Sequence, residues 1–138
     1  MSRVIKTETA AKDRTRLTRS VVLALRELMR QTQTDNHSRD LAAYIALTLV
    51  EIHETIDVSV AAWEKRGYWV KAERFRIEWE WTRTLAEKLS RAIFDDDWAM
   101  IAVIAAQIAQ KLMKVNVPVC HRLGTPWAGA WYKMKAAQ

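Results

Sequence analysis

The sequence has few of the residues that interrupt regular structure, and it cannot form an internal disulfide. Its 138 residues include three glycines, two prolines and a single cysteine, Cys120. Apart from Gly67, every glycine and proline lies between Pro118 and Gly129. Sheet proteins need turn residues at short intervals, so this distribution argues against an all-β fold and predicts an all-α one. A lone cysteine, together with an N-terminus that lacks an apolar signal segment, predicts a reducing, cytoplasmic location.

The longest apolar run, residues 41–63, predicts the centre of the core. On a helix, its large side chains fall three or four residues apart and form one stripe. This stripe consists of Ile45, Leu49, Ile52, Ile56, Val60 and Trp63. Burying one large apolar side chain contributes roughly 1.5–3 kcal/mol, so such a stripe would supply much of the stability of a small domain. Polar residues from Glu51 to Asp57 interrupt the run before the ~20 residues that a membrane span needs, so we expect no span.

Apolar residues recur at helical spacing along most of the chain and predict a single-domain bundle of four main helices, over residues 1–138. The expected helices span residues 9–31, 38–66, 68–94 and 96–114. Residues 1–8 are expected to fray. The tail, residues 116–138, contains Trp127 and Trp131, which disordered tails seldom carry. We therefore expect an ordered tail that packs on the bundle or on a partner.

The third expected helix, 68–94, has more apolar surface than one core contact needs. Around Phe75 to Trp81 apolar and charged residues alternate as in a strand, but a four-three repeat from Tyr68 to Ile93 fits a helix over the longer window. A second apolar strip on this helix needs a cover: another subunit, a partner protein or the chain's own tail. The interaction surface predicted from this strip and the tail comprises Val70, Ile77, Trp81, Trp127 and Trp131.

The fourth expected helix, 96–114, carries several alanines that would permit the close approach of a neighbour. They are Ala99, Ala102, Ala105, Ala106 and Ala109.

Positive charge is concentrated in the first helix. Of the net charge of +6, residues 1–30 contribute +5, from eight Lys or Arg and three acids, and the rest of the chain contributes +1. One face of the helix, the basic face, carries Lys12, Arg16, Arg19, Arg26 and Arg30. A basic face of this kind can bind the phosphates of a nucleic acid or an anionic membrane surface, or it can simply be a solvated surface. No aromatic residue is interleaved with these cations, which argues against single-strand binding.

The candidate residues for a metal site lie together on the central helix: His53, Glu54 and Asp57. Helical di-metal bundles use Glu-x-x-His pairs, and this chain has none. No nucleophile–base pair, phosphate-binding loop or zinc motif occurs either, so we predict no catalytic residue, no metal and no cofactor. The sequence therefore favours a non-enzymatic interaction or scaffold protein that acts through a homo-oligomer or a protein partner. Nucleic-acid binding and a metal or cofactor site at His53 are the alternatives.

Overall fold

The structure is a computed structural model that describes residues 7–118 and 124–137. Within these ranges the chain forms α-helices, one short 3-10 helix at Thr7–Thr9 and no strand, which confirms the all-α prediction. The helices are α1 (Ala10–Met29), α2 (Asn36–Lys65), α3 (Trp69–Trp79), α4 (Trp81–Phe94), α5 (Trp98–Lys111) and α6 (Ala130–Ala136). Most of the segment expected to fray, residues 1–6, lies outside the described residues, as does the part of the tail from 119 to 123.

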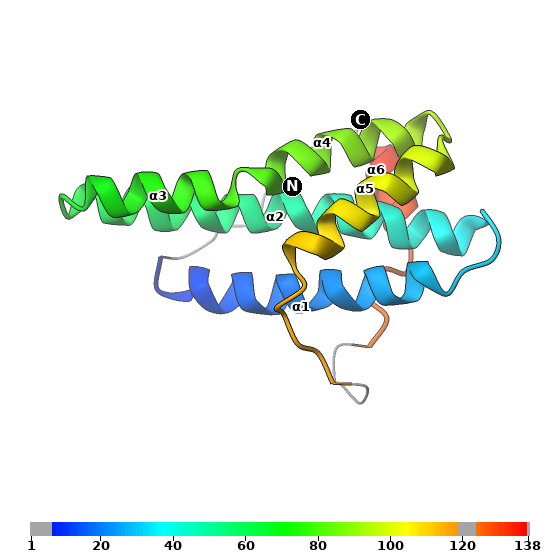
Figure 1. Cartoon of the computed structure of the whole chain (residues 1–138), viewed down its shortest axis with the longest axis horizontal. Helices are drawn as coiled ribbons and strands as arrows, with labels where there is room; N and C mark the ends of the chain where they lie inside the picture. The colour runs from blue at the N-terminus through cyan, green and yellow to red at the C-terminus, as the bar shows by residue number, and fades with distance from the viewer. Residues whose placement is uncertain (1–6, 119–123, 138) are drawn as a thin grey trace.

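Helix α2 is the central element of the bundle. It packs against α1, α3, α4 and α6, and in Figure 1 α1 lies on one side of it while α3 and α4 lie on the other. The predicted stripe explains this position, because its residues from Ile45 to Val60 are buried and Trp63 is half-buried. No helix in the described ranges is long and apolar enough to cross a bilayer, as the interrupted run 41–63 predicts.

Aspartates cap the N-termini of α2 and α5, which begin at the same end of the bundle. The Asp35 carboxylate accepts a hydrogen bond from the Ser38 backbone N–H (3.0 Å) at the start of α2, and this bond holds the pKa of Asp35 below its usual value. The Asp97 carboxylate accepts from the Met100 N–H (3.1 Å) at the start of α5. Both bonds satisfy backbone donors that the first turn of a helix leaves free.

The segment 68–94 is divided at Glu80 into α3 and α4, where the sequence predicts one continuous helix. The Thr82 hydroxyl donates to the Trp79 carbonyl (2.7 Å), and the Glu80 N–H reaches the Ile77 carbonyl only at 3.5 Å. A threonine hydroxyl that bonds back to the preceding turn competes with the helical ladder and bends the helix. The resulting change of direction between α3 and α4 is visible in Figure 1.

The described part of the tail packs on its own bundle. The Asp40 carboxylate, on α2, accepts hydrogen bonds from the backbone N–H groups of Gly129 (3.3 Å) and Trp131 (3.0 Å), at the start of α6. Arg26, on α1, donates to the Val117 carbonyl (3.0 Å). Trp127 is 6% exposed and belongs to the main core. Polar contacts to α1 and α2 thus hold the described tail at Val117 and at the start of α6.

Candidate functional site

The structure does not bring the five residues of the predicted interaction surface together. Val70 and Ile77 are 67% and 68% exposed on α3, but Trp81 is half-buried, with its ring stacked on that of Trp79 (centroids 6.1 Å apart). Trp127 lies in the core, and the half-buried Trp131 packs its ring against Phe94 (5.4 Å). The described part of the tail (116–118 and 124–137) therefore does not cover the α3 strip with its tryptophans, because both contact other parts of the bundle.

The exposed surface of α3 carries both apolar and charged side chains. A surface hollow of about 460 Å³ lies beside Val70, lined also by Trp63, Lys71 and Arg74. The Lys71 ammonium sits over the Trp63 ring at 4.5 Å from its centroid, so a cation already covers part of this surface.

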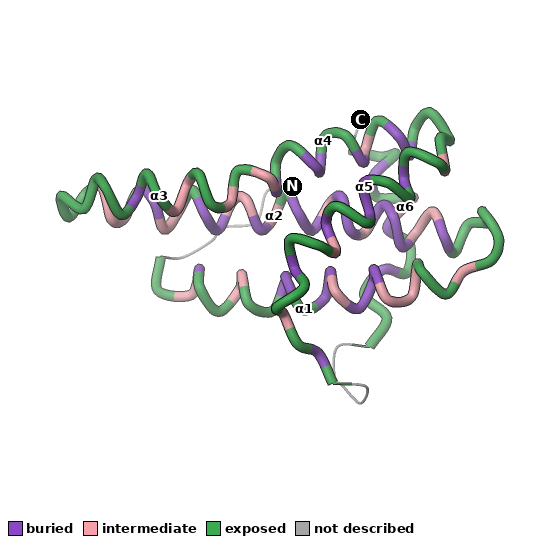
Figure 2. Tube along the Cα trace, in the orientation of Figure 1, coloured by how far each residue is buried: buried purple, intermediate pink, exposed green. Residues whose placement is uncertain are grey.

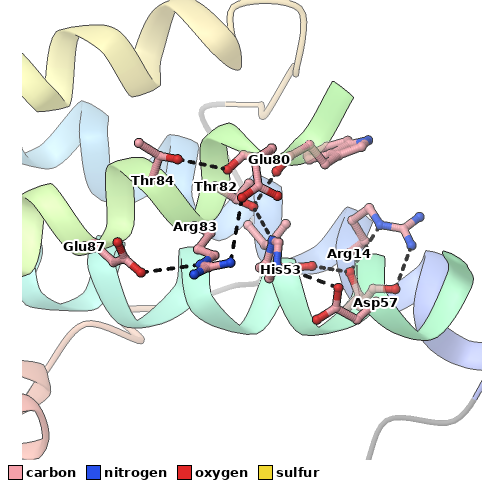
Figure 3. Close-up of polar contacts among 11 residues, drawn as sticks. Arg14, His53, Asp57, Glu80, Thr82, Arg83, Thr84 and Glu87 are labelled. Carbon is pink, nitrogen blue, oxygen red and sulfur yellow. Dashed lines mark hydrogen bonds and ion pairs between the residues drawn. The ribbon is translucent and has the colours of Figure 1, made fainter. Parts of the chain in front are cut away.

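Arg14 joins three helices through one guanidinium group, and Figure 3 shows its hydrogen bonds to α2. It donates to the Thr55 hydroxyl (3.2 Å), the Thr55 carbonyl (3.1 Å) and the Ser59 hydroxyl (2.7 Å), all on α2. The same guanidinium lies over the Phe75 ring of α3, 4.8 Å from its centroid. Partial burial lowers the pKa of Arg14 from its usual value. Because its acceptors are neutral oxygens within the protein, Arg14 has a structural role as a link between α1, α2 and α3.

His53 links α2 to the kink between α3 and α4, as Figure 3 shows. Its Nδ1 lies 3.3 Å from the Thr82 hydroxyl oxygen, and its Nε2 lies 3.7 Å from an Asp57 carboxylate oxygen. Since the Thr82 hydroxyl donates to the Trp79 carbonyl, we assign a proton to Nδ1 of His53, which then donates to the Thr82 oxygen.

The metal candidates do not form a ligand cluster. No group of three or more His, Cys, Asp or Glu side chains with metal-binding geometry occurs in the described part of the chain, which includes His53, Glu54 and Asp57. Glu54 instead shows the electrostatic consequence of its position. Partial desolvation, and then the neighbouring carboxylates of Glu51 and Asp57, raise the pKa of Glu54 above its usual value.

Glu54→Gln is expected to raise the melting temperature at pH 7. A carboxyl group whose pKa is raised by folding binds its proton more tightly in the native state, so stability falls as the pH rises through the raised pKa. The variant lacks this penalty, and its advantage should shrink as the pH is lowered toward 4. Thermal melts followed by circular dichroism between pH 4 and 7 measure the difference, with the exposed Glu78→Gln as the matched control. An equal melting temperature for Glu54→Gln and wild type at every pH would contradict this prediction.

Internal partners hold three of the five cations on the basic face of α1. Arg16 pairs with Asp13 (3.7 Å) and Arg30 with Glu27 (3.0 Å), while Arg26 donates to the Val117 carbonyl. The face remains positively charged, since only Glu27 and Asp13 are acidic within α1. It is less free to follow a phosphate backbone than its sequence indicates.

An apolar groove lies between α1 and α5, which we call the α1–α5 groove. One hollow of about 300 Å³ lies between the C-terminal end of α1, the α1–α2 connection and α5. Its apolar lining residues are Leu28, Met29, Trp98, Ile101, Ala102, Ala105 and Ala106, and its polar ones, from the connection and the start of α2, are Gln31, Thr32, Gln33, Thr34 and Ser38. A second, of about 270 Å³, is lined by Val22, Leu25, Met29, Ala109, Leu112 and Met113. Met29, which is 66% exposed, lines both hollows, so they adjoin at its side chain. The seam stays open because α5 packs mainly on α4 and touches α1 only slightly.

The outward side of α5 continues this apolar surface. Its exposed apolar residues are Ala99, Met100, Ala102, Val103 and Ala106, and Figure 2 shows long exposed stretches along this helix. Val103 is 52% exposed. Isolated apolar side chains on a surface are normal, but a groove that continues onto an apolar helix face is typical of a docking site. The alanine run in 96–114 was the sequence signal for it, although the sequence alone did not place α1 beside it.

Comparison with known proteins adds no further assignment to this geometry. No protein-family model, no curated protein and no solved structure matches the chain.

Proposed function

We propose that this protein is a non-enzymatic interaction module that works by docking another protein chain on its helical bundle. The observation that carries this proposal is the α1–α5 groove with the apolar face of α5 beside it. An apolar surface of this shape is where an amphipathic helix binds in many complexes. The lone cysteine agrees with a cytoplasmic location, which we include in the proposal.

The contacts of Arg14 and His53 support a structural role for these two side chains. Arg14 donates to hydroxyl and carbonyl oxygens of α2, and His53 lies between the Thr82 hydroxyl and the Asp57 carboxylate, so both hold helices in place. An acid–base catalyst needs a group that reaches a substrate in a pocket. The hollows of the α1–α5 groove contain no carboxylate or imidazole among their lining residues, whereas Glu87, Asp95 and Asp97 line a separate hollow of about 570 Å³ between α4 and α5. Nucleic-acid binding through the basic face is the alternative, with Lys12, Arg16, Arg19 and Arg30 as its exposed cations.

Size-exclusion chromatography with multi-angle light scattering, combined with peptide titration, tests this proposal. The protein is run alone at low and high salt with its 260/280 nm absorbance ratio recorded. It is then titrated with helical peptides that share one apolar face and carry acidic, neutral or basic flanks. We expect saturable binding of at least one peptide, or a defined oligomer, in a sample free of nucleic acid. A monomer that binds no peptide, or one that carries nucleic acid at low salt and releases it at high salt, would contradict the proposal.

A further inference from the structure

We infer that the α1–α5 groove binds one amphipathic helix of a partner protein, and that this helix carries acidic residues along one flank. The inference rests on the proposed function and adds the site and the chemistry of the partner. Three features support it: the size of the groove, the charge of its rim, and the like charges that a symmetric dimer of this chain would bring together.

The groove has the length and floor that a short helix requires. Helix α5 has 14 residues, which at 1.5 Å per residue make a wall of about 21 Å, or roughly four helical turns. Ala105, Ala106 and Ala109 lie along this wall and let the backbone of a bound helix come close. Met29 and Met113 are exposed at the edge, where flexible thioether side chains adapt to a partner's surface.

The rim of the groove is positive. Arg26 itself lines the second hollow, and Arg19 and Arg30 are seven and four residues from it on the same face of α1. At the other wall, Lys111 and Lys114 are exposed at the C-terminal end of α5. Glu27 pairs with Arg30 and offsets its charge, while Arg26 donates to a neutral carbonyl and keeps its charge, so Arg19, Arg26, Lys111 and Lys114 leave the rim positive. A docked helix whose flank carries charge opposite to that of the rim associates faster and in a fixed orientation. Because this rim is positive, the flank of the partner helix should be negative.

A second copy of the same chain fits this rim poorly. When two α5 faces pack about a twofold axis with the helices antiparallel, the α1 side of one copy lies beside the α1 side of the other. That arrangement would bring the two basic faces together. A parallel arrangement would instead place Asp97 beside the partner's copy of the same acid and align the two helix dipoles. Both arrangements put like charges together, so the rim favours a different, acidic chain.

The test uses two fluorescent peptides of about 16 residues, long enough to fill the groove at 1.5 Å per residue. They share a Leu/Ala face and differ only in flanks of Glu or of Lys. Fluorescence anisotropy with the full chain is expected to show the acidic peptide binding about tenfold or more tightly than the basic one at low salt. This difference should narrow between about 50 and 300 mM salt, as screening shortens the reach of the charges.

Three variants locate the binding site. Ala102 is exposed in the groove, and Ala102→Trp should lower the affinity for the acidic peptide about tenfold or more. The indole would occupy the space that a buried side chain of the peptide needs. Arg19→Glu with Arg30→Glu should reverse the preference between the two peptides. The control is Val70→Glu with Ile77→Glu on α3, which should leave both affinities unchanged. Circular dichroism melts show that each variant is folded.

Several results would overturn the inference while leaving the proposed function intact. Equal affinity for the two peptides would remove the charge argument. If Ala102→Trp left the affinity for the acidic peptide unchanged and the α3 double variant abolished binding, the site would lie at Val70 and Ile77 instead. A homodimer that Ala102→Trp converts to a monomer would assign the groove to a second copy. No saturable binding of the acidic peptide would overturn the inference by itself, and the proposed function would then depend on the oligomer and the other peptides.

Discussion

Ile52→Ala is expected to lower the free energy of unfolding by about 2–5 kcal/mol, the usual cost of removing a large side chain from a packed core. Ile52 is 0% exposed and lies in the middle of α2, the helix against which most of the others pack. The smaller side chain leaves a cavity that several helices line, so little relaxation is available to fill it. Urea unfolding followed by circular dichroism measures the change.

The matched control for Ile52 stands two residues earlier on the same helix. Val50 is 47% exposed, so Val50→Ala should change the free energy of unfolding by no more than about 0.5 kcal/mol. Losses of similar size in the two variants would contradict the central position of α2.

Arg14→Met is expected to lower the free energy of unfolding by about 1.5–3 kcal/mol, the range for hydrogen bonds made by a charged group. The lower part of the range is the better expectation, because the guanidinium is half-exposed and water replaces some of its bonds. The loss comes from the hydrogen bonds to Thr55 and Ser59, which methionine cannot donate, and from the positive charge over the Phe75 ring. Thermal and urea unfolding of the variant give the value.

Arg16→Met separates this specific loss from the general effect of removing a cation. Arg16 is exposed on the same helix and contacts Asp13 at 3.7 Å, a pair of the kind that contributes little to stability. Arg16→Met should therefore leave the free energy of unfolding nearly unchanged. If the two variants were equally stable, Arg14 would not link the three helices as its contacts indicate.

The fold was predictable because its signals are local and periodic. The stripe from Ile45 to Val60 repeats every three or four residues, and the scarcity of glycine and proline left helices as the only regular structure. The break at Glu80 was not predictable from this pattern, because a single hydroxyl of Thr82 bends a helix without changing its apolar period.

The candidate site was less predictable because it depends on how distant segments meet. The sequence indicates that the alanines of α5 permit a close neighbour, but α1 and α5 are separated by all of α2, α3 and α4. The tail shows the same limit. Trp127 and Trp131 predict an ordered segment, yet its position depends on Asp40, which bonds to Gly129 across 89 residues. Such contacts leave no periodic trace in the sequence.

The measurement that tests the central claim most directly is backbone amide hydrogen exchange of the full chain, with and without a saturating amount of the acidic peptide. We expect slower exchange in α5 and in the C-terminal half of α1, the two walls of the α1–α5 groove, with α3 unchanged. Protection confined to α3, or no protection in any segment at saturation, would contradict the claim that this bundle docks its partner between α1 and α5.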